Sequence, residues 1–496
     1  MSNELDPHHL VALMSHIFAS TQDGSSRRLD TSSHNFKHGI VDNHTTNVRT
    51  LPILDAIANI SVSRERSQSI AVALQLDSQK KEIRLTIAEN QRVTKALLDH
   101  LCNVWGNLQT LSNEYAEQRT GASDQPMHMA LTLKIQIFRD IYLYSLKKQM
   151  KRINKWFQNL GQFMKVLLNS RGSSNLQGFE VNLFDAVVAL FTALNLVGKL
   201  HDNPQSQLTD EQWAQVYRLS MKANEDVRVV LADRDGTSCE VLAEELKDDC
   251  PQGPFNLRRA LVKLTSLPQH IESLFGFAHS PRLRPTLLYR MFIIGVPKRS
   301  RKVQLPSSSS REWRLFLETA CQQSYNWQEG DAIELSEKFN SRTYMCAVHS
   351  ECKLIQYLET THENQWDNVP PFSYIGVSKL SCSACRIWIE SFNKLGGRQF
   401  YTRGSHDKWC WPWGMPRMGG PLDEIMAKKV LKEYIAYERA SNRLRLHSES
   451  TGASSSGAQH GLSDDQREEA VATSVLQEEF GGDMMLFLNS KFPDVW

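Results

Sequence analysis

The spacing of apolar residues changes along the chain, and this change constrains the fold most. In residues 70–76 and 83–87, apolar side chains alternate with small or polar ones, on either side of the polar stretch 77–81. Because successive side chains of a strand point to opposite faces of a sheet, this pattern predicts a β-hairpin. From Gln91 to about Gly276, apolar residues recur at every third or fourth position, which predicts amphipathic helices. The chain is therefore predicted to combine a sheet with a long helical segment.

A second region with strand signals covers residues 342–401. There the pattern predicts a helix that opens at His349, a short strand within 372–378 and a second helix that starts after Ser381. Serine is a residue type that caps helix N-termini. The second helix opens on Cys-Ser-Ala-Cys, residues 382–385, so its first turn is predicted to present two thiols on one face.

The stretch between these regions contains weaker strand signals. Residues 277–311 are predicted to be largely irregular, because they hold several prolines and the basic run 298–302. This run is either a nucleic-acid or nuclear-localisation patch or a solvated loop. A second hairpin, 287–294 with 303–305, competes with the first for the sheet, but Pro297 interrupts it, and we favour the first. Five segments are predicted: an N-terminal helix and flexible segment (1–66), a first hairpin (67–95), a mostly helical segment (96–335), the segment with the cysteine pair (336–447) and a disordered linker with an acidic and apolar tail (448–496).

Composition excludes some classes of protein. A net charge of +2 argues against a chain that binds nucleic acid through its overall charge. The most apolar helix candidate, 179–197, carries Glu180 and Asp185, so we expect a buried core helix and no membrane association. No signal peptide is recognisable, and nine cysteines without a regular framework predict reduced thiols. We therefore expect an intracellular protein, cytoplasmic or nuclear and not secreted.

One group of residues points to metal chemistry. Cys382 and Cys385 form the only Cys-x-x-Cys pair, 33 residues after His349, and Glu351 follows that histidine by two positions. Two thiolates at a helix start, where the dipole favours them, and one histidine from a neighbouring helix are a suitable set of Zn²⁺ ligands. Three protein ligands leave a coordination position open for water, which is typical of catalytic zinc. Glu351 is then placed to carry protons without binding the metal.

Residues 344–416 resemble a known superfamily. They contain His-x-Glu at 349–351, Ile-Gly-Val-Ser-Lys-Leu-Ser-Cys-x-x-Cys at 375–385 and Gly-Ser-His at 404–406. This order is similar to that of the cytidine-deaminase-like superfamily, and most closely to the OTT-type deaminases abundant in fungi. Ser381 stands where most members have proline, so the backbone that lines the substrate is expected to differ.

The resemblance implies a fold and a set of roles. His349, Cys382 and Cys385 are implied to bind zinc, and Glu351 is implied to shuttle protons. The implied fold is an α/β, three-layer α/β/α domain that begins with a β-hairpin, whose second strand often ends at an asparagine facing the substrate. Asn90 stands at that point of the predicted hairpin. We therefore expect a deaminase domain that is discontinuous in sequence, split by a large, mostly α-helical insertion.

A cationic and aromatic cluster covers residues 403–413. Aromatic rings stack on bases and cations bind phosphate, so His406 and Trp409 are candidates for contact with a substrate. Trp411 and Trp413 are predicted to pack at the edge of the core. The candidate substrate-binding residues are Asn90, Ser381, His406 and Trp409.

Other interpretations of the cysteine pair remain open. Cys346 and His349 form a Cys-x-x-His sequence, which with Cys382 and Cys385 would make a closed, structural zinc site. A thioredoxin-like dithiol is also compatible with Cys-Ser-Ala-Cys, but it leaves His349 and Glu351 without a role. The fold can also be kept while catalysis is lost.

The sequence thus predicts a zinc-dependent hydrolase that removes ammonia from a nucleobase by cleaving a cyclic amidine C–N bond. The substrate would be a nucleoside, a nucleotide or a base in single-stranded nucleic acid, and the cofactor Zn²⁺. The alternative is a non-catalytic, zinc-stabilised interaction protein whose helical domain binds a partner. Protein partners are not predicted.

Overall fold

The structure, a computed structural model, divides the chain into two compact units. One, the α/β unit, comprises residues 1–145 and 270–448, and the other, the helical unit, comprises residues 146–269. The predicted flexible stretch 23–47, and the predicted linker and tail beyond Ser448, lie outside the described residues. The structure describes residues 5–20, 51–120, 126–172, 175–176, 178–202, 208–232, 238–250, 255–306, 309–321, 329–361, 366–406, 408–418 and 421–448.

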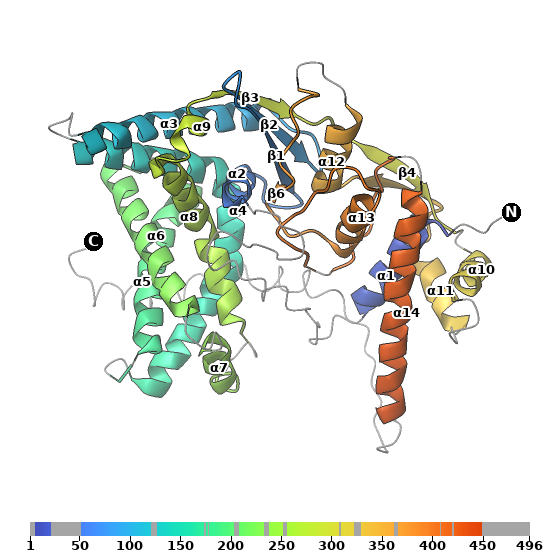
Figure 1. The fold of residues 1–496 in the computed structure, drawn as a ribbon. Helices are drawn as coiled ribbons and strands as arrows, with labels where there is room; N and C mark the ends of the chain where they lie inside the picture. Colours follow the sequence, from blue (N-terminus) through green and yellow to red (C-terminus); the bar gives the residue numbers. More distant parts are fainter. Residues whose placement is uncertain are drawn as a thin grey trace. The chain divides into compact units, whose positions relative to one another are not determined.

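The α/β unit contains a mixed sheet of four strands in the order β3-β2-β1-β6 (Figure 1). Strands β1 (Ile70–Asp77) and β2 (Glu82–Glu89) form the predicted antiparallel hairpin. Strand β6 (Gly376–Val377) pairs antiparallel with β1 and places Val377 opposite Ala71. The hairpin and the predicted strand within 372–378 therefore lie in one sheet, as a domain that is discontinuous in sequence requires, although only two residues of that stretch form a strand.

Strand β3 (Arg290–Gly295) runs parallel to β2 at the edge of this sheet. Strand β4 (Ser300–Gln304) pairs instead with β5 (Thr343–Ala347) in a separate two-stranded sheet. The prediction that 277–311 is largely irregular is therefore wrong. Pro297 lies between the two strands and interrupts neither of them. Because β3 pairs with β2 and β4 pairs with β5, these two strands do not form a hairpin with each other.

Helices pack on the four-stranded sheet from several parts of the chain. Helix α2 (Pro52–Ile60) packs on β1 and β6, and α12 (Ser350–Thr360) packs on β1 and β2. A side chain at Gly376 would collide with the backbone of Leu54 in α2, so the close approach requires glycine. The other helices of this unit are α1 (Pro7–Ser20), α3 (Lys95–Thr120), α9 (Arg284–Leu287), α10 (Ser310–Cys321), α11 (Glu329–Lys338), α13 (Ser383–Asn393) and α14 (Leu422–Ser448).

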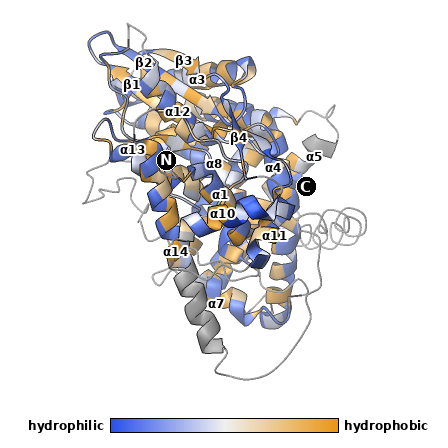
Figure 2. Cartoon of the chain, turned by 90° about the vertical axis from the view of Figure 1, so that its right-hand side faces the viewer, coloured by the Kyte–Doolittle hydropathy of each residue, from blue (hydrophilic) through white to orange (hydrophobic). Residues whose placement is uncertain are grey.

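The helical unit is built around α5 (Phe179–Asp202) and α6 (Asp210–Leu231), which pack on each other. Helix α5 includes one segment, Phe179–Gly198, that is long and apolar enough to cross a membrane, and 67% of it is buried inside the protein. Most helices carry both hydrophobic and hydrophilic residues (Figure 2), as expected where one face packs on a core. The remaining helices are α4 (Pro126–Arg171) and α8 (Leu257–His279), which contribute residues to both units, and α7 (Ser238–Glu245).

Candidate metal centre and active site

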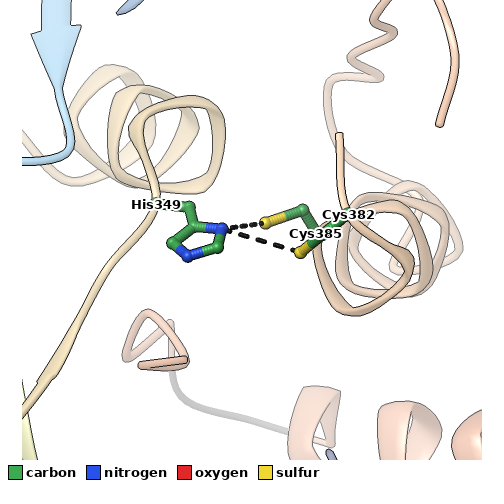
Figure 3. A group of neighbouring side chains, drawn as sticks. All are labelled: His349, Cys382 and Cys385. Atoms are coloured by element: carbon green, nitrogen blue, oxygen red, sulfur yellow. Dashed lines mark hydrogen bonds between the residues drawn. The ribbon is translucent and has the colours of Figure 1, made fainter. Parts of the chain in front are cut away.

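The starts of two helices bring one imidazole and two thiols together (Figure 3). His349 is the N-cap residue of α12, Cys382 is the N-cap residue of α13, and Cys385 follows in the first turn of α13. The Nδ1 atom of His349 lies 3.6 Å from Cys382 Sγ and 3.3 Å from Cys385 Sγ. All three possible ligand atoms lie within 4.8 Å of one another. The three predicted zinc ligands therefore meet at one point.

These distances fit a tetrahedral zinc site. With Zn–S bonds of about 2.3 Å, Zn–N bonds of about 2.0 Å and tetrahedral angles, an imidazole nitrogen and a thiolate sulfur are about 3.5 Å apart. The observed separations of 3.3 Å and 3.6 Å bracket this value. Nitrogen and sulfur are also the donor atoms that Zn²⁺ prefers. The three side chains could therefore hold the metal without a change in the backbone.

Burial sets the protonation of this group. It lowers the pKa of His349, which favours the neutral imidazole that binds metals, while the Glu351 carboxylate opposes the shift. Burial also raises the pKa of Cys385 well above its usual range, and a hydrogen bond with Cys385 does the same for Cys382. Both shifts favour the protonated thiols. A divalent cation is the kind of partner that would stabilise them as thiolates.

Glu351 lies in the first turn of α12 and is only 5% exposed. The hydroxyl of Ser350 donates a hydrogen bond to its Oε2 at 3.1 Å. Ser350 Oγ also lies 3.1 Å from Ser69 Oγ, and the backbone N–H of Ser69 donates to Asn90 Oδ1 at 3.0 Å. A short chain of polar contacts therefore links Glu351 to Asn90 at the end of the hairpin.

Asn90 is held in place by its own turn and by a buried lysine. Its amide nitrogen donates to the carbonyl of Ser67, so both ends of the amide bond the local backbone. Lys353, which is fully buried, donates from Nζ to the carbonyl of Glu89 and, at 3.2 Å, to that of Gln91. The ammonium thus bridges the residues on either side of Asn90. Contact between Asn90 and a substrate remains a prediction.

The predicted N-cap, Ser381, is wrong by one residue, because α13 is capped by Cys382. Ser381 is 1% exposed, and its backbone pairs with the loop at 404–406. Its N–H donates to the carbonyl of Gly404 at 3.1 Å, and its carbonyl accepts from the N–H of His406 at 3.0 Å. The loop of the Gly-Ser-His motif is therefore fixed directly beside the first metal-binding cysteine.

The aromatic residues beyond this loop have different positions. His406 is partly exposed, and its Nδ1 accepts from the N–H of Lys408 at 3.1 Å. Trp409 is 8% exposed and packs with the core, which leaves little of its ring for stacking on a base. Trp413 is fully buried, and its Nε1–H donates to Cys385 Sγ at 3.3 Å. The prediction that Trp413 packs in the core is confirmed, but the hydrogen bond to a candidate ligand was not foreseen.

Cys346 does not join the metal-binding group of the described residues, although it is fully buried on β5. Burial raises the pKa of its thiol to about 11. The closed site that combines Cys346 with the other three side chains is therefore not formed. Sequence reasoning missed Lys353, because its neighbours on the helix, Ser350 and Gln356, are polar and a basic residue there is usually solvated.

Comparison with known proteins gives one match. The family model described as "OTT_1508_deam:-like deaminase" matches residues 348–417. Neither a curated protein nor a solved structure matches the chain significantly. The matched segment includes all three candidate ligands, Glu351 and the loop that pairs with Ser381. Residues 348–417 therefore carry a deaminase-like segment of the OTT type, as the sequence motifs indicated.

Proposed function

We propose that this protein is a zinc-dependent hydrolytic deaminase that acts on a nucleobase, in a nucleoside, a nucleotide or a nucleic acid. One observation carries the proposal. An imidazole and two thiols meet at 3.3 Å and 3.6 Å, and a buried carboxylate follows in the first turn of the same helix as the imidazole. The family match over this segment supports deamination as the reaction class.

The proposed domain is a three-layer α/β/α deaminase domain, split in sequence by a helical insertion. Support comes from the pairing of β1 with β6 and from α12, which packs on β1 and β2 while it carries His349. We keep the segments 67–95 and 336–447 as the parts of this domain. Because β3 pairs with β2, we place the end of the insertion before Arg290, earlier than residue 335.

The proposed chemistry divides between the metal and the side chains. When bound, zinc would supply an activated water for attack on the ring carbon that carries the amino group. Glu351 would transfer one proton of that water to the ring nitrogen, and later the second proton, from the hydroxyl added at the ring carbon, to the departing amino group. The products are the carbonyl form of the base and ammonia. The Ser350 hydroxyl, which donates to Glu351, would orient the carboxylate, and the Trp413 indole would hold Cys385 in position.

The alternative, a zinc-stabilised interaction protein, makes a different demand on Glu351. A structural metal site needs no proton carrier, so a non-ionisable residue would serve equally well at position 351. In the deaminase, that position has to accept and release protons. We place the protein in the cytoplasm or nucleus, where thiols stay reduced.

An ammonia-release screen of the purified, full-length protein tests the proposal. The substrates are cytidine, adenosine, their monophosphates, and single-stranded DNA and RNA. We expect release from at least one of them in the wild type, and none above background in Glu351→Gln. The proposal fails if the zinc-loaded wild type releases no ammonia from any substrate, or if Glu351→Gln is equally active.

A further inference from the structure

A cavity of about 600 Å³ in the α/β unit is separate from the metal-binding group. Its walls come from the start of α1, from β4 and from α10, and neither the three candidate ligands nor Glu351 lines it. Pockets for small ligands commonly measure about 300–1,000 Å³. We call this feature the β4 cavity. Its size suits a ligand of several to a few tens of atoms.

Three cations line the β4 cavity: Arg301, Lys302 and Arg342. Lys302 and Arg342 are exposed, and neither forms an ion pair with a carboxylate in the described ranges. Arg301 is partly buried and donates from Nη1 to the carbonyl of Met415 at 3.2 Å, a neutral acceptor that leaves the positive charge uncompensated. None of the three cations is therefore in an ion pair with a carboxylate in the described part of the protein.

Two carboxylates also line the cavity, and one of them, Asp6, already accepts hydrogen bonds from His8. Asp6 Oδ1 lies 2.7 Å from His8 Nδ1 and accepts from the His8 backbone N–H at 2.8 Å. Although burial opposes ionisation, the contacts with His8 lower the pKa of Asp6 to about 2. Because His8 Nε2 accepts from the backbone N–H of Met415 at 3.1 Å, the ring donates to Asp6 without neutralising it, and Glu312, in the first turn of α10, is the other acidic group. Three cations stand against two carboxylates, so the lining carries an excess of positive charge.

The basic run predicted to lie in an irregular segment has a defined place here. Residues 300–304 form β4, whose backbone pairs with β5 along its length. On its other side, the carbonyl of Gln304 lies 2.9 Å from His9 Nε2 in α1. Arg301 and Lys302 thus project from a strand that is held on both sides, which reduces the entropic cost of ordering them around a ligand.

We propose that the β4 cavity binds a phosphate-bearing anion through Arg301, Lys302 and Arg342. A guanidinium offers several N–H donors in a planar fork that matches phosphate oxygens, and an ammonium adds a compact positive charge. Most of the lining residues are charged or polar, which favours a charged ligand over an apolar one. This proposal does not depend on the deaminase function, because none of its residues belongs to the metal centre.

Isothermal titration of the full-length protein with inorganic tripolyphosphate tests the proposal, with a single-stranded DNA oligonucleotide as a second probe. The double variant Lys302→Ala/Arg342→Ala should bind at least about tenfold more weakly than the wild type, because it loses two charged contacts. The control variant Arg398→Ala/Lys428→Ala removes two exposed cations elsewhere in the same unit and should bind like the wild type. Melting temperatures verify that all variants are folded.

The two probes distinguish the source of the phosphate. Binding of tripolyphosphate that is lost in the Lys302/Arg342 variant supports a free phosphate ligand. Binding of the oligonucleotide alone, lost in the same variant, supports the phosphates of a nucleic acid. The proposal is overturned if neither probe binds the wild type, or if both variants bind as the wild type does.

Discussion

The α/β unit and the helical unit bury different kinds of side chain. In the helical unit, the faces of α5 and α6 bury mainly apolar residues such as Leu183, Phe191 and Val227. The α/β unit buries charged residues as well, among them Glu351 and Lys353, beside its metal-binding group. Burial of a charge costs free energy unless it is paired, so such residues are retained where they serve a function. The difference places the candidate chemistry in the α/β unit.

Removal of a metal ligand should have the largest effect on the chemistry of the α/β unit. Cys385→Ser should lose its zinc and all measurable ammonia release, because two ligands cannot hold the metal in a tetrahedral site. Metal analysis of the purified protein gives the zinc content for each variant. Cys346→Ala is the matched control, since it removes a buried thiol of the same unit outside the metal-binding group. If Cys346→Ala loses the metal while Cys385→Ser keeps it, the assigned ligand set is wrong.

The next effect concerns the proton carrier. Glu351→Gln should keep zinc and its melting temperature, because glutamine has the same shape and still accepts from Ser350. Ammonia release should fall by a factor of about 10² to 10⁴, the usual contribution of general acid–base catalysis. Steady-state rates on the best substrate of the screen provide the measurement. Activity within a few-fold of wild type would remove Glu351 from the mechanism and favour the interaction-protein alternative.

Substitution of Lys353 should lower activity less than substitution of Glu351 does. It should leave the free energy of unfolding unchanged or raise it. Lys353→Met removes the bridge between the carbonyls of Glu89 and Gln91, so the turn at Asn90 loses its support. The value of kcat/KM should fall roughly ten- to a hundredfold, the scale expected when a group beside the reaction moves by about an ångström. The free energy of unfolding should change little or increase, because a methionine avoids the cost of a buried charge.

The pH dependence of stability distinguishes this explanation from a general packing defect. Burial lowers the pKa of Lys353 to about 8, whereas an unfolded lysine titrates near 10.4. Between these values the unfolded chain binds more protons than the folded one, so wild-type stability should rise with pH, by roughly 3 kcal/mol at most. Urea titrations from pH 7.5 to 10.5 should show this rise in the wild type and its absence in Lys353→Met. If the free energy of unfolding depends on pH equally in the two proteins, the lowered pKa of Lys353 is not the cause of the rise.

The sequence predicted the metal group better than it predicted the sheet, for a physical reason. Cys382 and Cys385 need only the local geometry of one helix start, and His349 needs one neighbouring helix. Strand β3 is stabilised by parallel pairing with β2, about two hundred residues earlier, and no local pattern carries that partner. Helix α2 was missed because its nine residues lie in a mixed region and gain their stability from contacts with β1 and β6.

The role of Lys353 was hidden for a related reason. Its burial depends on two backbone carbonyls from a segment more than 250 residues away, and a basic residue in a helix is usually solvated. Trp413 is similar, because aromatic composition predicts a core position but not which polar atom meets the indole. Ligand types and helix starts are thus readable from one sequence, whereas the partners of single buried polar atoms are not.

The smallest effect on the site should come from the core of the helical unit. Leu194→Ala in α5, where the side chain is 4% exposed, should destabilise that unit by about 2–5 kcal/mol through the cavity it leaves. Its zinc content, and its ammonia release per folded protein, should stay within twofold of wild type. Ile355→Ala is the matched variant, a fully buried residue of α12 in the α/β unit, and should lower both. Hydrogen exchange followed by mass spectrometry reports the two units separately, so the loss of protection in Leu194→Ala should be confined to residues 146–269.

If Leu194→Ala loses zinc as readily as Ile355→Ala does, the helices support the metal centre directly. The separation of chemistry from the helical unit would then have to be abandoned.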